Sequence, residues 1–185
     1  SDNPMNRLIM TWNTATGAWV NNFRNTSTFD ASKNITQYIN ENWSTASTTW
    51  VFSDRVNNTF DASNRMIKRI AEHWNTTTNV WENSSLDYYS YSSSGKRLEI
   101  YELSWDVLSS SWKDYSKRNY TYDTKDNLIE DKSTIWYVSG WKDDQQYFHT
   151  YNVDGNTEKS FSRRWSLSLN KWVDSTQTVY EYNSK

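Results

Sequence analysis

The sequence predicts an all-β protein, built as an antiparallel up-and-down meander of about twelve strands. Three observations predict this fold. Tryptophans occur in pairs that enclose short loops, the pairs recur at a fixed spacing, and Val, Ile, Thr, Tyr and Phe fill the segments between them. Proline occurs once, at Pro4, so the expected strand ladders are uninterrupted, and no segment shows the apolar spacing of an amphipathic helix.

The paired tryptophans define the repeat. The first Trp of each pair lies 31 residues after the one before it, except for a last step of 29 residues, which follows the shortened loop "WYVSGW". The six pairs contain all 12 tryptophans: Trp12 and Trp19, Trp43 and Trp50, Trp74 and Trp81, Trp105 and Trp112, Trp136 and Trp141, Trp165 and Trp172.

A second kind of turn alternates with the tryptophan loops. An aromatic residue stands ten residues after each second Trp and is followed by Asp, Asn or Ser; these aromatics are Phe29, Phe60, Tyr91, Tyr122, Tyr151 and Tyr182. Turn-forming segments such as "FDASKN" and "YNVDGN" follow. Each repeat unit is therefore expected to contain two strands and two turns.

The strands follow in order from these turns. In each hairpin the first strand leads into the first Trp, and the second strand runs from the second Trp to the aromatic residue. The expected strands are 4–12, 19–29, 34–43, 50–60, 65–74, 81–91, 96–105, 112–122, 127–136, 141–151, 156–165 and 172–182. They form one array over residues 1–185, with hairpins 4–29, 34–60, 65–91, 96–122, 127–151 and 156–182.

A register is expected in which the two tryptophans of each pair face each other across their loop. This register places opposite charges across several hairpins, as cross-strand pairing favours. The expected pairs are Lys68 with Asp87, Glu99 with Arg118, Arg163 with Asp174, and His73 with Glu82. It also gives one unfavourable pair, Arg7 with Arg24, in the first hairpin.

The face that carries the tryptophans also carries charge. Positions two and six residues before the first Trp hold Glu41, Glu72, Arg163, Lys68, Glu99, Glu130 and Lys159. Burial of these charges in a narrow interior would cost several kcal/mol each unless all were paired. The pattern therefore favours an open, twisted, single-layer sheet or a wide shell, and a closed 12-stranded barrel is the alternative.

The turn segments "YDTKDNL" (122–128), "YNVDGNT" (151–157) and "FDASKNI" (29–35) resemble the Y-D-x-x-G-[NR]-L motif of YD-repeat proteins, the RHS-type surface and toxin-shell proteins of bacteria. The motif's glycine is kept at Gly95 and Gly155 and replaced by Lys33, Asn64 and Asp126 elsewhere. The repeat of 31 residues is longer than the family's, and the paired-Trp loop is not part of the motif. The resemblance implies a meandering β-sheet in a secreted or surface bacterial protein and no catalytic residue.

The twelve paired tryptophans are the candidate ligand-binding residues. Facing indoles clamp a hairpin, and an aromatic pair adds ~0.5–1.5 kcal/mol beyond area burial. A row of indoles on one sheet face is also able to stack on the sugar rings of a repeating polysaccharide. The two roles are compatible, because a clamped indole can expose one face.

Catalytic and metal-binding roles are not expected. The chain has two histidines and no cysteine, and the carboxylates considered for glycoside hydrolysis (Glu41, Glu72, Glu99 and Glu130) recur at repeat spacing, whereas active sites are usually unique within an array. "NVDGNTE" (152–158) spaces oxygens somewhat like a calcium loop, but the other turns do not reproduce it. We expect no catalytic residue, no metal and no cofactor.

The leading functional hypothesis is a non-enzymatic, extracellular or cell-surface repeat module of a bacterial protein that binds glycans, as an adhesin does. The alternative is a structural stalk or shell segment without a ligand of its own. The net charge of −2 gives no basis for nucleic-acid binding, and no apolar run is long enough for membrane insertion. The expected partner is a polysaccharide or cell-surface glycan, with further repeats or another copy pairing at the sheet edges.

Overall fold

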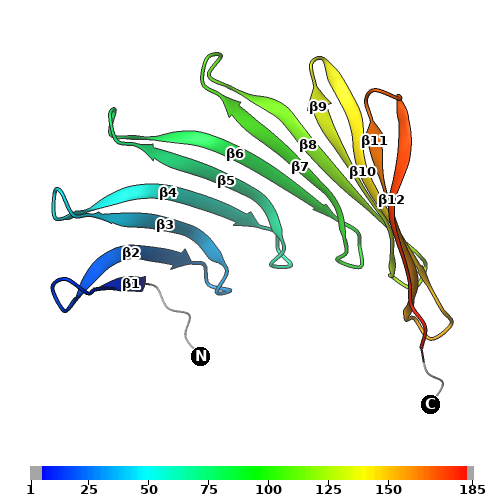
Figure 1. Ribbon diagram of the computed structural model, residues 1–185, viewed down its shortest axis with the longest axis horizontal. Coiled ribbons are helices and arrows are strands. Elements are labelled where there is room, and N and C mark those ends of the chain that lie inside the picture. The colour runs from blue at the N-terminus through cyan, green and yellow to red at the C-terminus, as the bar shows by residue number, and fades with distance from the viewer. Residues whose placement is uncertain (1–5, 183–185) are drawn as a thin grey trace. The chain divides into compact units, whose positions relative to one another are not determined.

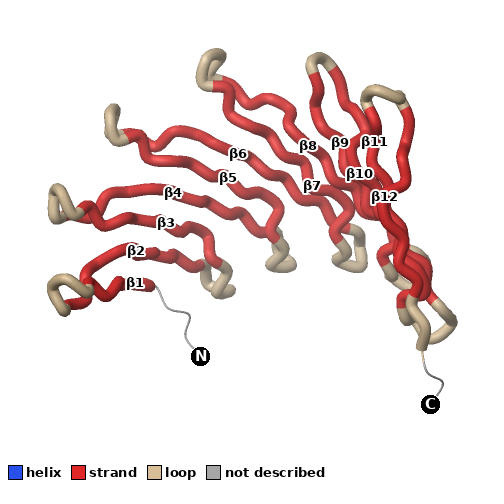
Figure 2. The backbone as a smooth tube through the Cα atoms, viewed as in Figure 1, coloured by secondary structure: helices blue, strands red, loops and turns tan. Residues whose placement is uncertain are grey.

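The computed structural model describes residues 6–182, and over these residues it contains strands, turns and loops without any helix (Figure 2). Twelve antiparallel strands form one meander in which neighbours in the chain are neighbours in the sheet (Figure 1). The strands are β1 Asn6–Asn13, β2 Ala18–Phe29, β3 Ile35–Ser44, β4 Thr49–Phe60, β5 Met66–Asn75, β6 Val80–Tyr91, β7 Arg97–Asp106, β8 Ser111–Tyr122, β9 Leu128–Tyr137, β10 Gly140–Tyr151, β11 Thr157–Ser166 and β12 Lys171–Val179.

The predicted fold class is confirmed, and the sheet is open. β1 and β12 are each bonded to one neighbour, so the alternative of a closed 12-stranded barrel is wrong. Strands β2 to β11 agree with their predicted ranges to within one residue at each end. β12 ends at Val179 instead of residue 182, and the predicted start of the first strand at residue 4 lies outside the described residues.

The sheet divides into two compact units. One comprises Ser1–Asp87 with Ser104–Trp112, and the other comprises Tyr88–Leu103 with Lys113–Lys185. Among the described hydrophobic side chains only Val56 and Leu86 are buried, because no second layer covers the sheet. Stability therefore depends on contacts between neighbouring strands, as in other repeat arrays.

A one-residue bulge shifts the register inside the hairpins. Trp12 lies opposite Trp19 as predicted, but Met10 lies opposite Asn21 and Ile9 opposite Phe23. Similar shifts follow the second Trp in β4, β10 and β12. Because successive side chains alternate between faces, one extra residue moves every later side chain of that strand to the other face.

The bulge decides which of the predicted charge pairs form. Arg163 does lie opposite Asp174, and His73 does contact Glu82, with 3.1 Å between Nε2 and Oε2. Arg7 lies opposite Asn25, which removes the expected clash with Arg24. Asp87 forms an ion pair with Arg69, and Glu99 accepts a hydrogen bond from Asn119, in each case a residue one position after the predicted partner.

The YD-type turns share one hydrogen-bonding scheme. In the first, the Asp30 carboxylate accepts hydrogen bonds from the backbone N–H groups of Ser32 and Asn34, both at 2.9 Å. The same pattern recurs at Asp61, Asp123 and Asn152. The position of the motif's glycine has positive φ in all five turns, from 59° at Asn64 to 86° at Gly95. This conformation explains why glycine suits the position.

Candidate functional site

The two tryptophans of every pair meet edge to face. Their ring centroids lie 5.0–5.5 Å apart and their planes cross at 68–82° in all six hairpins. This is the arrangement that the charge distribution of aromatic rings favours. The structure therefore brings each predicted pair of site residues together, and each pair closes its own tryptophan loop.

Cationic side chains cover the second Trp of several pairs. The guanidinium carbon of Arg24 lies 4.8 Å from the ring centroid of Trp50, and that of Arg55 lies 4.8 Å from the ring centroid of Trp81. Lys117 covers Trp141 at 4.4 Å. In each case the cation comes from the preceding repeat, so cation–π attraction joins one hairpin to the next.

Carboxylates hold the two arginines in place. Arg24 donates hydrogen bonds of 2.5 and 2.7 Å to Glu41, and Arg55 donates two of 2.7 Å to Glu72. The carboxylate side chains are largely buried under these contacts. The side-chain hydrogen bond to Glu41 raises the pKa of Arg24, so the cation over Trp50 is permanent.

The indoles differ in how much of their surface solvent reaches. Trp19 is 62% exposed and Trp12 is 47% exposed, and Trp136 is also exposed. The other nine tryptophans are half-buried, and none is buried. Over the described residues no cation lies over Trp19, and β1, the first described strand, pairs with β2 alone.

The acidic residues weighed as catalytic groups are engaged with neighbouring side chains. Glu41 and Glu72 are held by arginines, Glu99 accepts from Asn119, and Glu130 accepts from Gln146. Within residues 6–182 no three His, Cys, Asp or Glu side chains form a group that could hold a metal ion. In the calcium-like segment 152–158, the side-chain oxygen of Asn152 accepts the turn's own N–H groups.

A groove on the other face of the sheet was not predicted. It lies in the unit made of 88–103 and 113–185, it is lined by β7 to β10, and its volume is about 410 Å³. Its most exposed aromatic residue, Tyr115, stands three residues after a second Trp, where the other repeats have Asn, Ser or Asp. In the sequence, Tyr115 stands out because it departs from the repeat. The predicted site was instead based on residues that recur in every repeat, the tryptophans.

Comparisons with known proteins show similarity of fold. A scan of protein-family models and a search of curated proteins both gave no match. A protein of unknown function from Bacteroides fragilis superimposes with a TM-score of 0.55 at 11% identity, over 69% of this chain and 92% of that chain. At this identity the likeness shows the fold alone.

Two further structures are similar at lower scores. A DUF3836 family protein from Bacteroides vulgatus gives a TM-score of 0.41 at 17% identity, over 50% of this chain and 89% of that chain. TcdB2–TccC3, a toxin complex with RHS/YD repeats, gives 0.22 at 11% identity, over 95% of this chain and 13% of that chain. The likeness to an RHS-type protein is therefore weak. No described segment forms a helix long and apolar enough to cross a bilayer.

Proposed function

We propose that this chain is a non-enzymatic carbohydrate-binding repeat module of a secreted or surface bacterial protein. The observation that carries the proposal is the exposure of the indoles: none of the twelve is buried, and Trp12 and Trp19 present bare surface at the sheet edge. A solvated indole face is a platform for the apolar face of a sugar ring. Tryptophan is enriched at binding interfaces because it combines a large apolar ring with an N–H that can donate a hydrogen bond.

The spacing of the pairs suits a polymer. Neighbouring strands lie about 4.8 Å apart, so pairs on successive hairpins are separated by about 10 Å within one unit. That distance is comparable with two linked pyranose rings. A polysaccharide running across the strands would therefore meet one Trp pair per disaccharide in the unit that contains β1 to β5.

A structural role is the second candidate, and a specific observation favours it. Arg24, Arg55 and Lys117 cover Trp50, Trp81 and Trp141, which removes ring surface from solvent at those three pairs. Pairs covered in this way act as clamps between hairpins. We therefore assign glycan contact first to Trp12 and Trp19 and less to the covered pairs.

The wider assignment rests on the turns. Hydrogen bonding of the YD type recurs in successive turns, and Gly95 and Gly155 keep the motif's glycine at positive φ. These features support membership of an RHS-like class of extracellular repeat proteins. The open edges at β1 and β12 support continuation by further repeats or by another copy, since unpaired strand edges attract strands.

A panel of uncharged and acidic polysaccharides, read by tryptophan fluorescence and by pull-down on insoluble glycans, tests the proposal. We expect binding to at least one glycan, and weaker binding when Trp12 and Trp19 are both changed to Ala. Trp81→Phe is the matched control, because Arg55 already covers that ring. Absence of binding to every glycan, with all indoles protected from a soluble quencher, would leave the structural role.

A further inference from the structure

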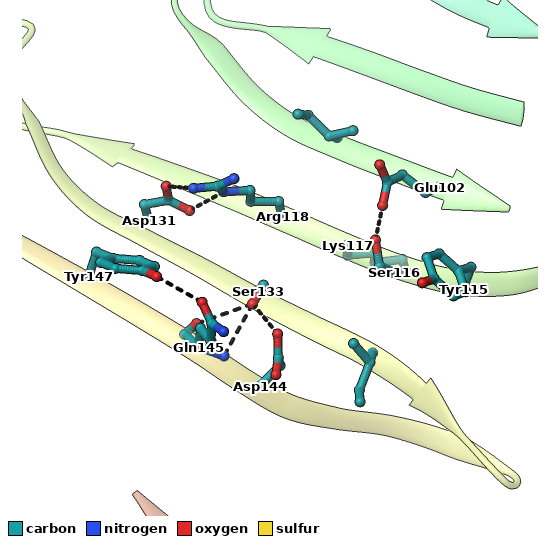
Figure 3. Close-up of a pocket in the computed structure, with 12 residues that line it drawn as sticks. Glu102, Tyr115, Ser116, Lys117, Arg118, Asp131, Ser133, Asp144, Gln145 and Tyr147 are labelled. Atoms are coloured by element: carbon teal, nitrogen blue, oxygen red, sulfur yellow. Dashed lines mark hydrogen bonds and ion pairs between the residues drawn. The ribbon is translucent and has the colours of Figure 1, made fainter. Parts of the chain in front are cut away.

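The groove of about 410 Å³ lies on the face away from the tryptophans. Figure 3 shows the side chains that line it. In β9, Trp136 points to one face, so Asp131, Ser133 and Ile135 point to the other. Arg118 lies opposite Ser133, and Tyr147 lies opposite Asp131, which places both on this second face. A volume of this size is within the range of small-ligand sites, about 300–1,000 Å³.

A bulge in β10 builds the centre of the groove. Thr134 lies opposite Asp143 and Lys132 lies opposite Gln146, so Ser133 faces two residues, Asp144 and Gln145. Ser133 Oγ donates to Asp144 Oδ2 at 2.8 Å and accepts from the backbone N–H of Gln145 at 3.1 Å. Bulges are frequent beside binding sites because they redirect side chains.

Two tyrosines lie at opposite ends of this polar centre (Figure 3). Tyr115 is 60% exposed, and Tyr147 is 38% exposed with its hydroxyl donating to Gln145 at 2.8 Å. Glu102 reaches the groove from β7 and accepts a hydrogen bond from Ser116. The groove thus combines two aromatic rings with oxygen acceptors between them.

These residues depart from the repeat. The positions equivalent to Tyr115 and Asp144 are Asn22, Ser53, Ser84 and Ser175. The positions equivalent to Tyr147 are Asn25, Val56, Asp87, Arg118 and Thr178. A framework that only held hairpins together would repeat the same chemistry, as the Trp face does. The combination of Tyr115, Asp144 and Tyr147 belongs to this groove and is not repeated at the equivalent positions of the other hairpins.

The charge of the groove selects its ligand. Glu102, Asp131 and Asp144 contribute three carboxylates, and Arg118 contributes the one guanidinium, which is paired with Asp131. Lys117 lines the groove, but its ammonium lies 4.4 Å from the Trp141 ring on the other face. The lining is therefore net negative and disfavours anionic ligands.

We propose that this groove binds a short segment of an uncharged glycan. The rings of Tyr115 and Tyr147 stack on pyranose faces, and the carboxylates of Glu102 and Asp144 accept hydrogen bonds from sugar hydroxyls. Ser133 occupies Oδ2 of Asp144, which leaves Oδ1 as the acceptor for the ligand. The groove is proposed to bind the same class of ligand as the tryptophan face, but the two sites have no residue in common. Each site can therefore be disproved without the other.

Titration with cello-, malto-, laminari- and xylo-hexaose, each compared with oligogalacturonate, tests this site by calorimetry. We expect one uncharged hexaose to bind and the acidic one not to bind. Tyr115→Ser and Asp144→Ser install the residue that Ser53, Ser84 and Ser175 provide in other repeats, so the variants retain the fold. Each is expected to weaken binding at least tenfold, while Tyr180→Ala, which removes an exposed tyrosine elsewhere, leaves it unchanged.

The outcomes separate the two sites. Unchanged affinity in the Tyr115→Ser/Asp144→Ser double variant, with binding lost in the Trp12→Ala/Trp19→Ala variant, overturns the groove and keeps the proposed function. Loss of binding in the Tyr115→Ser/Asp144→Ser variant alone supports the groove as the binding site. Tighter binding of oligogalacturonate than of any uncharged hexaose, or no binding of any hexaose by the unaltered protein, overturns the groove as a neutral-glycan site.

Discussion

Arg24 of β2 covers Trp50 of β4 across the intervening strand, with 4.8 Å between the guanidinium carbon and the ring centroid. Glu41 of that intervening strand, β3, holds the guanidinium with two hydrogen bonds. One side chain therefore links three strands, and Arg55 does the same for β4, β5 and β6 through Glu72 and Trp81. In a sheet without a second layer, such links add to the backbone pairing that joins one hairpin to the next.

Removal of one such link should destabilise the protein. Arg55→Ala leaves the Glu72 carboxylate, 13% exposed, without its charged partner and uncovers Trp81. Because hydrogen bonds to charged groups contribute about 1.5–3 kcal/mol, we expect the free energy of unfolding to fall by about 2 kcal/mol. Chemical denaturation followed by tryptophan fluorescence measures the change.

The chain itself offers the control for this variant. The residues at the positions of Arg55 and Glu72 in the next repeat are Leu86 and Leu103. An Arg55→Leu/Glu72→Leu double variant should therefore recover most of the stability lost in Arg55→Ala, since no unpaired charge remains. A double variant no more stable than Arg55→Ala would show that the ion pair is not the source of the effect.

The strand order was predictable because it depends on local signals. Each Trp loop and each YD-type turn joins consecutive strands, so recognising the turns gave the meander and its strand boundaries. The register beyond each loop was not predictable, because the residues skipped in the bulges, such as Asn22 and Ser53, are ordinary strand-edge or turn residues. One unrecognised residue is enough to bring Arg69, one position after the predicted Lys68, into an ion pair with Asp87.

The candidate sites were predictable to different extents. The contact between paired tryptophans followed from their symmetric place around each loop. The cations over Trp50 and Trp81 did not, because Arg24 and Arg55 reach that face only through the bulge. Tyr115 was visible as a departure from the repeat, but its groove depends on where four strands place their side chains.

The loop of the second Trp pair contains a strained residue. Thr48 has φ of 53°, and the equivalent position in neighbouring loops holds Gly17 or Asn79. A β-branched residue is unfavourable in this left-handed region, at about 1–2 kcal/mol. Thr48→Gly should therefore stabilise the protein by about 0.5–1 kcal/mol after the entropy cost of glycine, seen as a higher Tm. The adjacent Thr49→Gly, inside β4, should lower the Tm, and a fall for both would contradict the strain at Thr48.

The aspartates of the YD-type turns should make stability depend on acid pH. Hydrogen bonds from the Asn127 side chain and backbone lower the pKa of Asp123 below its ordinary 3.8, and turn hydrogen bonds likewise lower the pKa values of Asp30 and Asp61. A carboxyl group whose pKa is lower in the folded than in the unfolded protein stabilises the folded state at pH values above its ordinary pKa. This contribution disappears as the pH falls through the lowered pKa values.

Substitution of these three aspartates by Asn should therefore flatten the dependence of Tm on pH below about 4. The fifth turn shows that Asn accepts the same backbone hydrogen bonds, since Asn152 accepts from Asp154 and Asn156. Asn152→Ser is the control, because it alters a turn without removing an ionisable group. An unchanged slope in the triple variant would contradict the role of the turn carboxylates.

Tyr101 of β7 should ionise only in strong alkali. Its hydroxyl donates to the Asp114 carboxylate, and this hydrogen bond, with burial, raises the pKa of Tyr101 from 10.0 to about 12. The raised pKa stabilises the folded state below pH 10, and the contribution is lost as the pH rises through 12. NMR titration of ring-labelled tyrosines should resolve a late-titrating signal of Tyr101, which Asp114→Asn moves toward the ordinary value; the pKa values of Tyr122 and Tyr151, raised mainly by burial, should not respond to this variant. Asp174→Asn, on a different hairpin, should leave the Tyr101 signal in place, and a Tyr101 signal insensitive to Asp114→Asn would assign the shift to burial instead.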